Sequence, residues 1–358
     1  MLVLGPPQAR PLYEAIGRSL ARRGAYAVFQ LSPDGGVGAV NRSWVRHAPD
    51  ELVGTPSGIQ AHVLAECDAL IVVLAPENTR DASSVDATRY TQARGSYRHA
   101  MHRFDADEAP WVACHFPTPG LAQEAGMATD EFADFLYAAC LLDWEAERER
   151  MQRYADRFDA ADEVRVVGEG TDLRLGITGR PTEVDAGGTG GGVNMPGGEF
   201  FCCPLENSAE GEIVFGEFPA VYRGREVRGI RLRFEAGRVV DASAETNEDF
   251  LVETLDTDEG SRRLGELGIG CNPGITRSMG NPYFDEKIDG TVHLALGFAF
   301  PQFGGKNESS IHWDIVKDLR PRPVPGHRAS PDDPGGQHNG GRIELDGTVV
   351  QESGRWLV

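Results

Sequence analysis

The chain has 358 residues and a formal net charge of −20, with 40% hydrophobic and 25% charged residues. Its acidity argues against nucleic acid as a partner, because phosphates require a basic surface. No apolar run approaches the roughly 20 residues of a membrane helix, and no basic start precedes an apolar stretch at the N-terminus, so we expect no membrane partner, no signal peptide and a cytoplasmic protein.

Strand-like and helix-like segments alternate through residues 1–165. Apolar runs predict strands at 2–5, 25–31, 69–75 and 110–116, and helical spacing predicts helices over 10–23, 58–66, 88–104 and 130–161. Residues 69–75 are apolar throughout, which is typical of a strand buried on both faces of a parallel sheet. We therefore predict an α/β domain over residues 1–165.

From residue 166 the pattern changes to short strand-like segments that glycine turns separate. Helical spacing is limited to about 246–267, and the Pro- and Gly-rich residues 321–342 predict a loop. The glycine run at 187–192 also predicts a loop, since it lacks the Lys-Ser/Thr ending of a phosphate-binding loop. We predict a second domain over residues 166–358 that is α+β and mostly antiparallel.

Two residue types have informative distributions. The six cysteines are scattered without metal-site spacing, and we interpret them as small buried apolar residues. Only three basic residues are lysines, namely Lys287, Lys306 and Lys317, and the others are all arginines.

A histidine and an aspartate stand two residues apart in IHWDIV (311–316). His312 and Asp314 would share one face of a strand, where they form half of a metal site. His293 lies within another apolar strand, TVHLALG (291–297), where an unpaired imidazole would be costly. The alternative for each histidine is a satisfied hydrogen bond inside the core.

Two glutamates have neighbours that predict burial. Glu199 precedes an apolar run, and Glu266 lies in RRLGELGIG (262–270). A buried carboxylate requires a cation or good hydrogen bonds, whereas a surface position is the simpler alternative for each glutamate. Together with the two imidazoles and Asp314, these glutamates would hold two divalent ions through shared ligands, zinc or cobalt being our expectation. The sequence therefore predicts a metal-dependent hydrolase.

Several longer segments stand in a distinctive order: 110–144, GTDLRLGITGR (170–180), NMPGGEFF (194–201), RRLGELGIGCNPG (262–274), NPYFDEKIDGTVHLALG (281–297) and GGKNESSIHWDIVKDLR (304–320). In this order they resemble the thermophilic metallo-aminopeptidase family, the aminopeptidase T group often labelled leucyl aminopeptidase. The resemblance covers nearly the whole chain.

The resemblance implies an N-terminal α/β domain, a C-terminal domain with two metal ions, peptide substrates and a homodimer around an internal cavity. It also implies the metal ligands, which are Glu199, Glu266, His293, His312 and Asp314. Glu266 is the candidate for a bridging ligand or for the carboxylate nearest the attacking water, and hence for a catalytic role.

The sequence departs from the family pattern at two places. Family peptidases carry a tyrosine seven residues after the first histidine, whereas this chain has Phe300, which can neither ligate a metal nor donate a hydrogen bond. The chain also begins later than family members do, so we expect Met1 to be a truncated or misassigned start.

Two other functions are consistent with parts of this pattern. His293, His312 and Asp314 alone form a two-histidine, one-carboxylate set, which suits a mononuclear Fe(II) ring-cleaving dioxygenase of the dihydroxypyridine type. A non-catalytic scaffold on a decayed peptidase fold is the third hypothesis. The presence of both Glu199 and Glu266 favours two metals and the hydrolase.

Overall fold

The computed structural model describes residues 1–31, 42–81, 85–105, 108–187, 192–323, 337–338 and 340–357. Most of the predicted loops at 187–192 and 321–342 lie outside these residues. The chain forms two compact units, of which the first comprises Met1–Glu145, Asp185–Gly197 and Arg223–Arg225 and the second comprises Ala146–Val184, Gly198–Tyr222 and Glu226–Val358. The domain boundary at 165/166 stays a prediction.

Among the described residues, no helix has the length and apolarity that a membrane span requires.

The first unit is built on a parallel sheet, as its alternating strands and helices predicted. Its five strands lie in the order β2-β1-β3-β4-β8, and each neighbouring pair is parallel. The strands are β1 (Leu2–Gly5), β2 (Val28–Leu31), β3 (Leu70–Leu74), β4 (Trp111–His115) and β8 (Gly192–Met195). The last strand comes from the second half of the sequence, where its four residues after a glycine run gave no clear strand signal.

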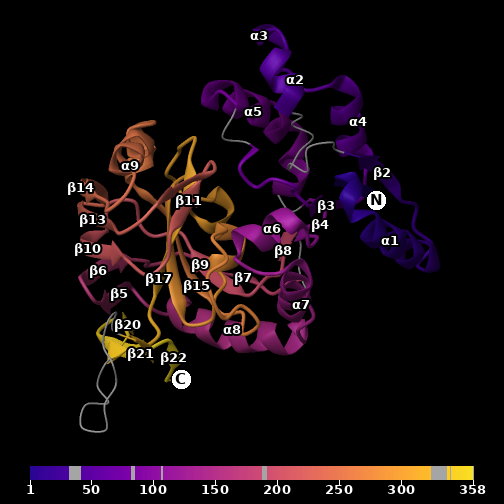
Figure 1. The fold of residues 1–358 in the computed structure, drawn as a ribbon. Helices are drawn as coiled ribbons and strands as arrows, with labels where there is room; N and C mark the ends of the chain where they lie inside the picture. Colours follow the sequence, from indigo (N-terminus) through magenta and orange to yellow (C-terminus); the bar gives the residue numbers. More distant parts are fainter. Residues whose placement is uncertain are drawn as a thin grey trace. The chain divides into compact units, whose positions relative to one another are not determined.

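Helices connect and flank these strands (Figure 1). They are α1 (Arg10–Arg22), α2 (Arg42–His47), α3 (Asp50–Val53), α4 (Gly58–Glu66), α5 (Ala87–Asp105), α6 (Pro119–Glu124) and α7 (Thr129–Cys140). The single helix predicted over 130–161 is wrong, because α7 ends at Cys140 and α8 (Trp144–Asp159) begins after a break. The indole N–H of Trp144 donates to the Cys140 carbonyl at 2.8 Å, so a side chain satisfies the carbonyl that a continuing helix would bond through its backbone.

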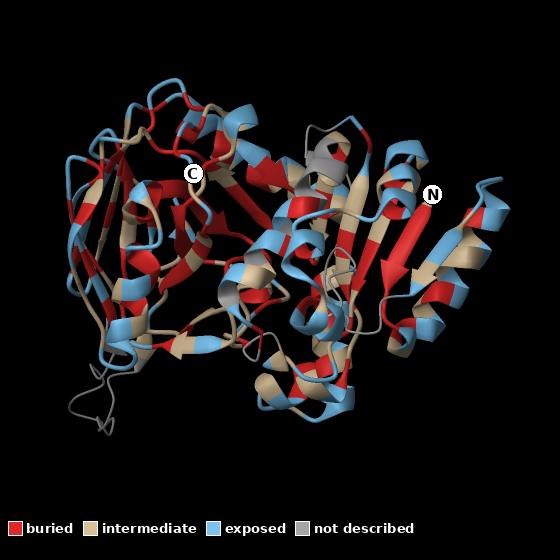
Figure 2. Cartoon of the chain, turned by 90° about the horizontal axis from the view of Figure 1, so that it is seen from above, coloured by how far each residue is buried: buried red, intermediate tan, exposed pale blue. Residues whose placement is uncertain are grey.

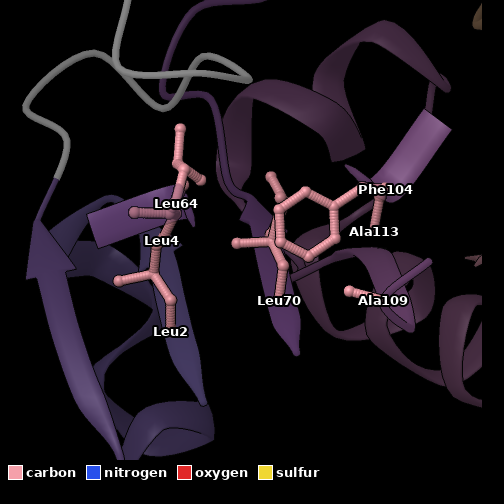
Figure 3. Packing of buried hydrophobic residues seen from close by; sticks show 8 residues of the cluster. Leu2, Leu4, Leu64, Leu70, Phe104, Ala109 and Ala113 are labelled. Carbon is pink, nitrogen blue, oxygen red and sulfur yellow. The ribbon is translucent and has the colours of Figure 1, made fainter. Parts of the chain in front are cut away.

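Apolar side chains from several of these elements pack on the sheet of the first unit. Figure 3 shows Leu2 and Leu4 of β1 near Leu64 of α4 and Leu70 of β3, with Phe104 of α5 beside them. Burial of such side chains contributes about 1.5–3 kcal/mol each and is the main stabilising term for this sheet. In Figure 2 the buried residues follow the strands, whereas helices expose their outer faces.

The second unit consists mainly of antiparallel sheets, again as predicted. One sheet has eight strands in the order β14-β13-β10-β6-β5-β20-β21-β22. These are β5 (Glu163–Gly168), β6 (Thr171–Gly176), β10 (Glu210–Phe215), β13 (Ile230–Glu235), β14 (Arg238–Ser243), β20 (Arg342–Leu345), β21 (Thr348–Glu352) and β22 (Arg355–Trp356). A hairpin turn at Asp346-Gly347 joins β20 to β21.

A second sheet, of five strands in the order β17-β16-β15-β9-β7, carries the residues of interest. Its strands are β7 (Glu183–Asp185), β9 (Glu199–Cys202), β15 (Leu264–Gly270), β16 (Thr291–Gly297) and β17 (His312–Asp318). The pairs β9–β15, β15–β16 and β16–β17 are antiparallel. Further elements are the short strand pairs β11 (Ala220–Tyr222) with β12 (Arg225–Val227) and β18 (Arg322–Pro323) with β19 (Gln337–His338), and the short helix α10 (Pro282–Asp285).

The helix predicted over 246–267 extends too far. Helix α9 (Glu248–Leu255) ends early, and residues 264–267 belong to β15, which is buried along its whole length. Gly265 explains the difference, because a Cβ there would lie 2.0 Å from the Phe298 carbonyl oxygen. The glycines of this segment allow close backbone approach in a sheet, whereas in a helix they would cost about 1 kcal/mol each.

We expect Phe104→Ala to destabilise the first unit by about 3–5 kcal/mol, because it empties part of a packed core. Phe104 is 1% exposed, whereas Ile59 on α4 is 81% exposed. The matched variant Ile59→Ala should change stability by no more than about 0.5 kcal/mol. Hydrogen exchange of the β1 and β3 amides under increasing urea measures both effects. Equal protection in the two variants would contradict this assignment of the core.

Candidate metal centre

Four adjacent strands supply the five predicted ligands. Glu199 begins β9, Glu266 lies on β15, His293 lies on β16, and His312 and Asp314 lie on β17. Because side chains alternate along a strand, His312 and Asp314 point to one face while Trp313 is buried on the other.

The register aligns these residues across the sheet. Glu199 pairs with Gly270, and His293 pairs with Gly268. Further along, Ala295 lies between Glu266 on one side and Asp314 on the other. All five predicted residues therefore occupy a single face of the sheet.

Glu266 is the residue that links the two imidazoles. Its Oε1 lies 3.1 Å from Nε2 of His293, and its Oε2 lies 3.6 Å from Nε2 of His312. The remaining carboxylates extend the cluster at its two ends. Glu199 Oε2 lies 3.3 Å from His293 Nε2, and Asp314 Oδ1 lies 3.5 Å from His312 Nε2. The five residues thus form one continuous chain of oxygen and nitrogen donors.

Burial is greatest at the β9–β16 side of this cluster. His293 is fully buried and both glutamates are 5% exposed, whereas the His312 and Asp314 side chains are 28% and 16% exposed. A small molecule would therefore reach the cluster from the β17 side.

The donor atoms fit a bound cation. Nδ1 of His312 lies 2.9 Å from the Phe298 carbonyl, so this nitrogen donates and Nε2 is left as an acceptor. Within the described part of the chain, Glu199 Oε2 is buried without a hydrogen-bond partner, and ligand atoms of Glu199, Glu266 and His293 all lie within 4.8 Å of one another. Carboxylate oxygen and imidazole nitrogen together suit zinc and several other divalent ions.

The pKa values show that the centre favours positive charge. Burial alone lowers the pKa of His293, but the hydrogen bond that its Nε2–H donates to Glu266 and the nearby carboxylates raise the pKa to about 9. For His312, burial is likewise outweighed by Asp314 and Glu266, which raise the pKa to about 10. Burial raises the pKa of Glu266 despite its histidine neighbours. Without metal, protons on the imidazoles therefore supply the charge that the carboxylates require.

Sequence reasoning missed two residues that shape this centre. A Cβ at Gly268 would lie 2.0 Å from Nε2 of His293, so only glycine lets the imidazole lie against β15. Lys287 is fully buried, with its ammonium 2.9 Å from Glu199 Oε1 and also paired with Glu286. The scarcity of lysine in the chain was the one signal that could have indicated its special position.

Phe300 lies beside the centre as part of an aromatic wall. Its ring is 5.3 Å from the His312 ring in an edge-on arrangement. Phe201, Phe298 and Phe303 pack around it with ring centroids 5.8, 5.5 and 6.2 Å away. We define these four phenylalanines as the aromatic wall, which offers the centre apolar surface and no hydrogen-bond donor.

Comparisons with known proteins agree on one family. The family model described as thermophilic metalloprotease (M29) matches residues 1–329. Aminopeptidase 2 of Geobacillus stearothermophilus is 28% identical over 365 residues, covering 88% of this chain and 86% of the relative. Aminopeptidase T of Thermus thermophilus is 29% identical over 302 residues, covering 74% of this chain and 69% of the relative.

Solved structures share the fold. Wild-type AmpT from Thermus thermophilus superposes with a TM-score of 0.79 at 23% identity, covering 100% of this chain and 94% of that one. The 2,5-dihydroxypyridine dioxygenase from Pseudomonas putida KT2440 superposes with a TM-score of 0.61 at 16% identity, covering 100% and 91%. At these identities the superpositions establish the fold alone.

We expect Gly268→Ala to weaken binding of divalent metal by about 10- to 100-fold, the loss typical when the support of a ligand is disturbed. The added methyl group must displace the His293 ring. Isothermal titration with zinc measures the effect. Gly95→Ala, on α5 with nothing within 4 Å, is the control and should bind metal as the wild type does. Unchanged affinity in Gly268→Ala would contradict the placement of His293 at the metal.

The metal-free protein should lose stability as the pH rises. The folded-state pKa values of His293 and His312, about 9 and about 10, lie above the unfolded value, so their contribution is complete below about pH 6.5 and is lost as the pH rises through the folded values. Urea unfolding of chelated protein at increasing pH measures this loss. A variant with both histidines changed to alanine is the control, and an identical slope in it would refute the prediction.

Proposed function

The chain belongs to the thermophilic metalloprotease (M29) family, and we propose that it is a metal-dependent aminopeptidase that hydrolyses N-terminal residues from peptides. The observation that carries the proposal is the contact of Glu266 with both His293 and His312 within a buried, carboxylate-rich face. Such an arrangement is costly unless it serves to hold cations.

We further propose that two divalent ions, zinc or cobalt, occupy this face. Their ligands would be the five residues predicted from the sequence, namely Glu199, Glu266, His293, His312 and Asp314. Divalent ions in such a site supply Lewis acidity, which polarises a carbonyl group and makes water a nucleophile near neutral pH.

The side chains divide the remaining work. Glu266 has one oxygen directed to each imidazole, so it is placed either to bridge two ions or to be the carboxylate nearest the attacking water. The more exposed His312 and Asp314 lie where a substrate would enter. A substrate's protonated N-terminal amine would be attracted by the surplus of carboxylates.

The aromatic wall offers the centre no hydrogen-bond donor. Phe300 stands against His312 without a hydroxyl group, so the oxygen that gains negative charge during hydrolysis has no donor at this position. Phe300 therefore leaves that oxygen one donor fewer, and the cations would stabilise it. We also propose that the chain assembles as a homodimer. Light scattering, which measures the mass of the particle in solution, would test this.

Metal content and hydrolysis of leucine p-nitroanilide, measured together on one preparation, test the function. We expect about two zinc or cobalt ions per chain and hydrolysis that chelation abolishes and zinc restores. About one iron per chain with oxygen uptake and no hydrolysis would instead support the Fe(II) dioxygenase that uses His293, His312 and Asp314. A protein that neither binds metal nor hydrolyses the anilide would support the scaffold.

Variants test the residues themselves. Glu199→Gln, His293→Ala and Asp314→Asn should each reduce metal-dependent hydrolysis by more than about 100-fold, because each removes a ligand rather than its support. Asp241→Asn on β14, an exposed position, is the control and should keep full activity. Circular dichroism checks that each variant is folded. Full activity in all three ligand variants would show that the centre lies elsewhere.

A further inference from the structure

Lys287 is a buried cation within a group of buried carboxylates. It is one of three lysines, and its side chain is 0% exposed. A buried ammonium is costly unless opposite charges surround it. Lys287 therefore requires a specific anionic partner at this position.

The main chain holds Lys287 firmly. Its residue follows α10, its carbonyl accepts a hydrogen bond of 2.8 Å from the Asn272 amide, and its own amide donates to the Phe284 carbonyl at 3.1 Å. The ammonium lies 5.3 Å from the centroid of the Tyr283 ring, which covers one side of it. The position of the charge is therefore a property of the fold rather than of a mobile side chain.

The Lys287 ammonium forms an ion pair with Glu199, one of the five proposed ligands. Nζ of Lys287 lies 2.9 Å from Oε1 of Glu199, whose other oxygen faces His293 at 3.3 Å. Glu266, in contrast, directs both of its oxygens to imidazoles. Glu199 can therefore offer a metal one oxygen, whereas both oxygens of Glu266 are available once metal replaces the protons of the histidines.

We propose that Lys287 is a fixed internal cation of the metal centre, which occupies one oxygen of Glu199 and makes the two metal positions unequal. This inference rests on the proposed function. The ion next to Glu199 has one oxygen fewer to bind and an ammonium nearby that repels it. The other ion would take its ligands from Glu266, His312 and Asp314. The Lys287 charge also reaches Asp314, but both oxygens of Glu266 are directed to imidazoles, so this ion keeps more of its ligand oxygens and binds more tightly.

Equilibrium dialysis against Co²⁺ tests the proposal independently of activity. Wild-type protein should bind one cobalt tightly and a second at least about tenfold more weakly. Lys287→Met removes the charge, and we expect it to strengthen the second step by about tenfold or more while the first changes less, so that the ratio of the two constants falls. Lys287→Arg keeps the charge and should keep the inequality. Lys287→Gln, which keeps an N–H donor to Glu199 without charge, is the second neutral variant in case the methionine variant does not fold.

A matched control exists in the same unit. Lys317 is also buried and pairs with Glu217 at 2.8 Å, so Lys317→Gln removes a buried ammonium away from the centre. It should leave both cobalt constants as in the wild type.

Several results would overturn the proposal. They are two indistinguishable cobalt sites in the wild type, an unchanged ratio of the two constants in the folded neutral variants, and an equal weakening of both steps, which would make Lys287 a support for Glu199 as a ligand. Failure of the wild type to bind cobalt at all would refute the proposed function itself, so the two failures are distinguishable.

Discussion

Buried negative charge is the constraint on which the rest of the second unit depends. Four carboxylates crowd around one sheet face, namely Glu199, Glu266, Glu286 and Asp314. Isolated ionised carboxylates are not tolerated inside a protein, so positive groups must lie among them. The imidazoles and Lys287 meet this need without metal, which links the register of four strands and the position of α10 to a single charge balance.

Glycine makes such crowding sterically possible. On β15, Gly268 lets the His293 ring lie against the backbone, and Gly265 lets the strand approach the Phe298 carbonyl. That same carbonyl orients His312. The glycines of β15 thus determine the orientation of both histidines although none of them bears a functional group, and a helix over these residues would separate Glu266 from its partners.

The sequence alone indicated the parallel sheet, the antiparallel sheets and residues that prove to be neighbours. His312 and Asp314 were recognisable because alternation on a strand is a local property. The strand at residues 264–267 was not recognisable from the sequence. The spacing of its apolar residues also fits a helix, and only long-range packing decides between the two. Lys287 escaped notice for the same reason: its burial depends on partners that are distant in the sequence.

The shared fold does not by itself select the chemistry, because the structure superposes both on AmpT and on a dihydroxypyridine dioxygenase. The donors decide. A triad of His293, His312 and Asp314 would leave the buried Glu199 and Glu266 without purpose, although both lie within 3.3 Å of His293 Nε2. The aromatic wall contributes no donor, so we expect the proposed centre to rely on charge at that position, where its carboxylates would favour a substrate that brings an amine.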